Sequence, residues 1–147
     1  MTGVRERVVR GGLLFFALVS AGLGVVILAV PEWFFSLSWV NLGMQYNPHL
    51  LLDYGAMNLA LAVPLAASAV AATPAAVRSG TAAYAVWSVA HLVIHLRYRA
   101  HLTAHTSAVN ANLLLVVLAV GVVISLILFL LSLRDRTAGR KNQRVSG

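Results

Sequence analysis

Four ionisable side chains in the middle of the chain form two pairs, each spaced by one helical turn. His49 and Asp53 are one pair, and His91 and His95 are the other. Residues four apart lie on one face of a helix, with Cβ atoms about 5–6 Å apart. Imidazole nitrogen and carboxylate oxygen are ligands for Zn, Fe, Mn and Cu. The spacing therefore predicts a divalent transition-metal site formed by all four residues, provided that the two helices are neighbours.

Further polar residues could belong to this site. Three are expected around it or at its entrance: Glu32, His101 and His105. Three more could line a pocket for a lipid tail or a quinone ring, or could simply pack against other helices: Tyr84, Trp87 and Ser88. The alternative to a metal is a structural polar cluster in which Asp53 pairs with Arg97 or Arg99.

The composition indicates the class of protein in which these residues lie. The chain has 147 residues, of which 60% are apolar and 10% charged, and it has no cysteine. Soluble domains carry about 25% charged residues. Disordered chains are poor in apolar residues, and thiolate or disulfide sites need cysteine. The composition therefore excludes those classes and favours an integral membrane protein.

Four apolar segments are each long enough to cross a hydrocarbon core about 30 Å thick. Backbone groups in lipid must be satisfied within the segment, so helices are expected. Asn47-Pro48 and Thr73-Pro74 are typical helix starts, a capping side chain followed by proline. We predict one all-α domain over 1–147, a four-transmembrane-helix bundle. Its expected parts are helices at 11–30, 48–72, 74–98 and 108–133, with basic tails at 1–10 and 134–147.

The positions of the arginines and lysines predict the orientation. The first ten residues hold three, Arg78 is one more, and the last fourteen residues hold five; the opposite side has only Arg97 and Arg99. Cytoplasmic segments are enriched in Lys and Arg. Both termini are therefore expected in the cytoplasm of a multi-pass plasma-membrane protein. This orientation brings the two ionisable pairs to one depth in the outer half of the bilayer.

Three functions fit these features, and whether the protein is an enzyme stays open. The first is a metal site that acts on a lipid-soluble substrate or handles metal at the outer face. The second is a non-catalytic scaffold, with the small residues of the second helix packing against another copy or a membrane partner. The third is a haem or quinone electron carrier, with haem disfavoured because closely packed helices leave little room for a porphyrin. No nucleic-acid motif accompanies the basic tails.

The segment Tyr46-Asn47-Pro48-His49-Leu50-Leu51-Leu52-Asp53-Tyr54-Gly55-Ala56 and the later His91-Leu92-Val93-Ile94-His95 carry a resemblance. The chain resembles uncharacterised small actinobacterial four-helix integral membrane proteins with a YNxHLxxDxGA segment and a later HLxxH. The resemblance covers the two middle helices. It implies no activity, but it falls on the same four ionisable residues.

Overall fold

The computed structural model describes residues 3–134, and every regular element in that range is a helix. Of the predicted C-terminal basic tail, 134–147, all residues after Arg134 lie outside the described residues. The helices are α1 (Val4–Ala29), α2 (Pro31–Ser36), α3 (Ser38–Asn41), α4 (Pro48–Ala71), α5 (Pro74–Arg97), α6 (Arg99–His105) and α7 (Ala108–Leu133).

Three of the four long helices, α4, α5 and α7, begin at side chains that cap their first backbone N–H groups. The Asn47 side chain accepts a hydrogen bond from Leu50 N at 3.1 Å, and Thr73 accepts one from Ala76 N at 3.2 Å. Ser107 does the same at the start of α7. Such a cap pairs one of the backbone N–H groups that otherwise lack a partner at the N-terminus of a helix. The two starts predicted from Asn-Pro and Thr-Pro are therefore confirmed.

The predicted helix positions need two corrections. The first helix begins at Val4, not at residue 11, so its arginines belong to a helix and not to a tail. The second correction concerns the segments expected as loops, which contain the short helices α2, α3 and α6. Charged residues do not end a helix whose N–H and C=O groups remain paired along the chain. The first helix therefore continues through Arg10, Arg7 and Arg5.

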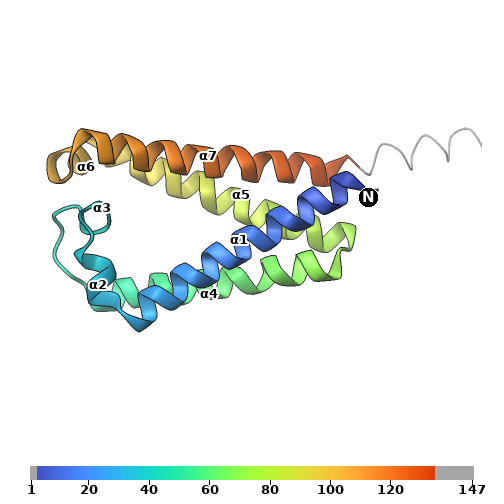
Figure 1. The fold of residues 1–147 in the computed structure, drawn as a ribbon, viewed down its shortest axis with the longest axis horizontal. Coiled ribbons are helices and arrows are strands. Elements are labelled where there is room, and N and C mark those ends of the chain that lie inside the picture. Colours follow the sequence, from blue (N-terminus) through green and yellow to red (C-terminus); the bar gives the residue numbers. More distant parts are fainter. Residues whose placement is uncertain (1–2, 135–147) are drawn as a thin grey trace, which may run out of the picture.

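Two helix pairs make up the bundle, α1 with α4 and α5 with α7. Figure 1 shows the arrangement: α4 and α5 meet at their connection and separate towards the opposite end. We call that opposite end, which holds α2, α3 and α6, the histidine end. The other end, which holds the start of α1 and the end of α7, is the arginine end. The α4–α5 neighbour relation expected from sequence is thus closest near the arginine end.

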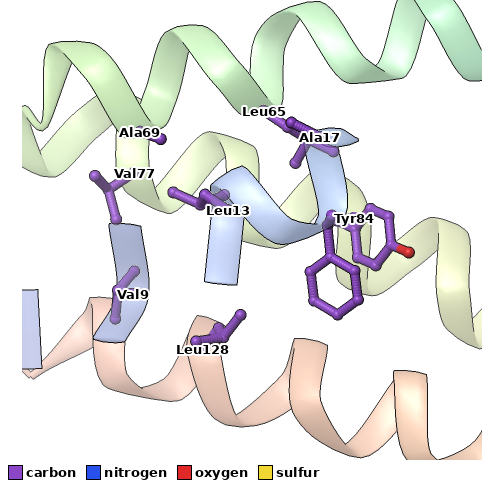
Figure 2. Packing of buried hydrophobic residues seen from close by; sticks show 9 residues of the cluster. Val9, Leu13, Ala17, Leu65, Ala69, Val77, Tyr84 and Leu128 are labelled. Atoms are coloured by element: carbon purple, nitrogen blue, oxygen red, sulfur yellow. The ribbon is translucent and has the colours of Figure 1, made fainter. Parts of the chain in front are cut away.

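A buried apolar cluster joins all four long helices in the half nearer the arginine end (Figure 2). Its members are Val9, Leu13, Phe16, Ala17, Leu65, Ala69, Val77, Tyr84 and Leu128. A smaller cluster of Leu42, Leu102 and Ala111 closes the histidine end. Both clusters fix how the helices are rotated about their axes, which decides where the ionisable side chains point.

Three helices are long and apolar enough to cross a membrane: α1, α4 and α7. Their outward faces are rich in exposed large apolar side chains, for example Leu18, Val63 and Val116. An apolar surface of this kind is stable in lipid and costly in water. The protein is therefore an all-helical chain of membrane type. The helix α5 is as long as α4, 24 residues, but it is not among the three, and the fourth span stays a prediction.

Candidate functional site

The His91 and His95 side chains touch each other on one face of α5. Their ring centroids are 4.7 Å apart, with the rings nearly perpendicular at 76°. Both residues are half-buried. Within residues 3–134 neither ring makes a hydrogen bond. The ring nitrogens of both residues keep some exposed surface, so they are accessible to an ion or a ligand.

Aromatic rings continue from this pair towards the core. The Trp87 ring stacks on His91 at 4.9 Å with an interplanar angle of 11°. Tyr84 contacts Trp87 at 5.4 Å and stacks on Phe16 of α1 at 4.0 Å. The packing of these rings holds His91 in a fixed position against the rest of α5 and α1.

Tyr54 of α4 shows that the two predicted pairs lie at the same height along the helix bundle. Its ring faces His91 with centroids 6.4 Å apart and planes 15° from parallel. Tyr54 directly follows Asp53, so the turn of α4 that contains the carboxylate lies beside the turn of α5 that contains His91. Sequence reasoning did not select Tyr54. Its signal was its place next to Asp53 and Gly55.

The His49 and Asp53 side chains bond to each other instead of joining the α5 pair. Nδ1 of His49 lies 3.2 Å from Oδ2 of Asp53, and the two side chains are 87% and 61% exposed. The cause is the rotation of α4 about its axis. Gly55 packs against Ile27 and Leu28 of α1. At about 100° per residue, Asp53 lies about 200° from Gly55 and so on the side of α4 away from α1.

The predicted convergence of four ligands is therefore not formed. Among residues 3–134 there is no group of three or more His, Asp or Glu side chains placed to hold one metal ion. The four residues instead form two separate i, i+4 pairs, one on each of two helices. The metal itself stays a prediction.

A third pair of the same kind lies on α6. The His101 and His105 rings are 4.3 Å apart, and Nδ1 of His105 lies 2.9 Å from the carbonyl oxygen of His101. Both side chains are exposed, and the His105 ring packs directly over Gly43. Glu32 is exposed on α2 at the same end of the bundle. The residues expected around the site thus share its end of the molecule without contacting His91 or His95.

Two of the three suggested pocket residues take part in helix packing. Tyr84 is buried against Phe16, and the Ser88 hydroxyl lies 2.8 Å from the Ser125 hydroxyl of α7. The gap between these helices is too narrow for a water molecule and is lined by Leu13, Phe16, Thr81, Tyr84, Ser125 and Leu128. Trp87 alone remains half-buried beside His91.

No family model, curated protein or solved structure matches this chain. The geometry of the three pairs is therefore the evidence that bears on function.

Proposed function

We propose that the protein handles transition-metal ions at the histidine end, with the ion held in turn by pairs of ligands. One observation carries this proposal: each of the five histidines belongs to an i, i+4 pair with another metal-ligating side chain, and the members of each pair are in contact. Chance would leave some histidines isolated. Imidazole nitrogen is a good ligand for Zn, Cu, Fe and Ni, and carboxylate oxygen is also a good ligand for Mn.

The pairs favour metal handling over a resident catalytic metal. Structural and catalytic zinc sites take three or four protein ligands, whereas each pair here supplies two. An ion held by two protein ligands keeps open positions for water or for the next pair, so it can leave. His101 and His105 are exposed at the end of the bundle, whereas His91 and His95 are half-buried between helices. The His91–His95 pair is the candidate membrane-embedded position.

The proposal includes α5 as a fourth membrane span, with both termini in the cytoplasm. The length of α5 and its packing along α7 support this. Polar groups inside a bundle are tolerated when they face protein. Ser88 bonds to Ser125, and Thr81 bonds to Ser132 at 3.3 Å, both on α7. In this topology the histidine end lies at the outer face of the plasma membrane.

Equilibrium dialysis of the detergent-purified chain against Zn²⁺ tests the proposal. Three double variants are compared: His91→Gln/His95→Gln, His101→Gln/His105→Gln and His49→Gln/Asp53→Asn. Each should lose about one bound ion per chain and keep the others, so each serves as the control for the other two. An unchanged stoichiometry in His91→Gln/His95→Gln would refute the proposal. A Soret band in the wild-type preparation would indicate haem ligation instead.

A second candidate function is a membrane scaffold, and the exposed face of α4 favours it. Ala56, Ala60 and Ala67 are exposed on one side of the helix, beside the His49–Asp53 pair. Small residues allow another helix to approach closely in lipid. Gly55, another small residue of α4, is buried against α1 and does not belong to this exposed face.

Crosslinking in membranes separates this candidate from metal handling. Ala60→Leu should abolish a crosslinked homo-oligomer or partner band, whereas Val120→Leu on the exposed face of α7 should leave it unchanged. Equal crosslinking in the two variants would exclude α4 as the contact surface.

A further inference from the structure

A short contact joins the two helix pairs at the histidine end. Helix α2 packs on α1 and α4, whereas α6 packs on α5 and α7, and α3 reaches from α2 to α7 (Figure 1). The Leu42 side chain, directly after α3, is buried with Leu102 of α6 and Ala111 of α7. The next residue, Gly43, lies under the ring of His105. We call the contact of Leu42 and Gly43 with these three residues the clasp.

The backbone of the clasp has an unusual conformation. Both Leu42, with φ 51°, and Gly43, with φ 73°, lie in the left-handed region. A side chain at Gly43 would overlap the His105 ring, so this position needs glycine. Leucine rarely adopts a left-handed backbone, and such a conformation persists only where surrounding contacts hold it. The burial of Leu42 therefore keeps the clasp closed, and loss of that burial favours its opening.

The closed clasp engages both ring nitrogens of His105. Nδ1 lies 2.9 Å from the carbonyl oxygen of His101, and because a carbonyl only accepts, Nδ1 carries the proton. A metal binds an unprotonated imidazole nitrogen, which leaves Nε2. Nε2 is among the ring atoms that pack closest to Gly43. An ion shared by His101 and His105 therefore requires the His105 ring to leave Gly43.

We propose that an ion bound by the His101–His105 pair opens the clasp. This inference rests on the proposed function, which assigns an ion to that pair. The His105 ring cannot hold the ion and pack on Gly43 at the same time, so ion binding and closure exclude each other and are linked thermodynamically. Opening frees Leu42 from α6 and α7. The exposed pair thereby regulates the end of the bundle at which the half-buried pair of α5 lies.

Hydrogen–deuterium exchange of the full-length chain in detergent, with and without Zn²⁺, tests the proposal. Zn²⁺ should speed exchange of residues 38–44 by about tenfold or more, because an open form populated at about 10% or less becomes the major one. In His101→Gln the backbone carbonyl that bonds His105 remains, but one ligand is lost. Zn²⁺ should therefore leave exchange in His101→Gln unchanged. His91→Gln/His95→Gln is the control and should respond as wild type does.

The zinc affinity of the His101–His105 pair gives a second readout. Leu42→Ala removes the buried side chain of the clasp, so it should tighten Zn²⁺ binding by about tenfold or more, since the free energy of opening no longer opposes binding. Met44→Ala is the matched control, because Met44 is 55% exposed and lies outside the clasp. It should leave the affinity unchanged. Both variants are measured by equilibrium dialysis in a background without the other two pairs: His49→Gln, Asp53→Asn, His91→Gln and His95→Gln.

The outcomes separate this inference from the function on which it rests. Unchanged or slower exchange of residues 38–44, in protein that binds Zn²⁺ at the His101–His105 pair, would overturn the inference and leave the proposed function intact. Equal affinities in Leu42→Ala and Met44→Ala would do the same. Absence of Zn²⁺ binding by this pair in the dialysis background would overturn the inference together with the assignment of an ion to that pair.

Discussion

The contact between Gly24 of α1 and Gly55 of α4 yields the sharpest prediction about stability. A Cβ atom at Gly24 would lie 2.8 Å from the carbonyl oxygen of Gly55 and 2.8 Å from Cγ of Leu59. The Leu59 side chain can move, but the oxygen belongs to the α4 backbone. In Gly24→Ala the two helices must therefore separate. This contact also sets the rotation of α4, and with it the direction of Asp53.

The size of the effect follows from overpacking. Adding a methyl group to a well-packed contact costs about 1–3 kcal/mol, and the backbone position of the clash favours a value of about 2 kcal/mol. That is roughly a 30-fold change in the unfolding equilibrium constant. Gly22, two residues earlier in the same helix, has nothing within 4 Å of the position of an added Cβ. Gly22→Ala should stabilise the helix by about 0.5–1 kcal/mol.

The assay is unfolding of the purified chain from mild detergent by titration with sodium dodecyl sulfate, followed by tryptophan fluorescence. Gly24→Ala should unfold at a lower mole fraction of dodecyl sulfate than wild type, and Gly22→Ala at the same or a higher one. Gly55→Ala should fall between them, because its nearest neighbour, at 2.8 Å, is the side-chain Cγ2 of Ile27. Equal stability of Gly24→Ala and Gly22→Ala would contradict a clash with the α4 backbone at this contact.

Three further predictions follow from particular bonds. The hydrogen bond between Ser88 and Ser125 is tested by a double-mutant cycle of Ser88→Ala and Ser125→Ala. The coupling free energy should be about 0.6 kcal/mol. A coupling of zero would contradict a bond between α5 and α7. Thr73→Ala should cost about 1 kcal/mol because it removes the side-chain cap of α5. Thr106→Ala keeps the backbone bond from Thr106 N to the carbonyl oxygen of Leu102 and should have little effect on the unfolding titration. The sequence has no cysteine, so single cysteines report topology cleanly. Val40→Cys and Thr103→Cys should react with an impermeant maleimide from outside the cell, and Ala75→Cys should not; labelling of Ala75→Cys alone would reverse the proposed orientation.

The sequence predicted those parts of the fold that depend on local chemistry. Asn47-Pro48 and Thr73-Pro74 mark the starts of α4 and α5, because capping and the fixed φ of proline act within a few residues. Apolar length predicted α1, α4 and α7 as membrane helices. The start of α1 lies at Val4, earlier than the residue 11 that the apolar segment alone predicts. Charge does not prevent a helix from continuing beyond the apolar segment.

The arrangement of the candidate site could be predicted only in part. Spacing alone brings His91 to His95 and His49 to Asp53, since each pair lies on one helix face. Which face of α4 meets α5 depends on tertiary packing, here on Gly55 against α1. A spacing argument therefore predicts pairs but cannot show that two pairs converge. Tyr54, and not Asp53, occupies the side of α4 that faces His91.

The proposed function requires that each pair of ligands at the histidine end can hold one ion. X-ray absorption at the zinc edge, on Zn²⁺-loaded protein carrying His101→Gln, His105→Gln, His49→Gln and Asp53→Asn, tests it most directly. We expect two imidazole nitrogens at about 2.0–2.1 Å from the ion, with oxygen from water in the remaining positions. A spectrum without imidazole scattering, or one unchanged by adding His91→Gln and His95→Gln, would contradict it.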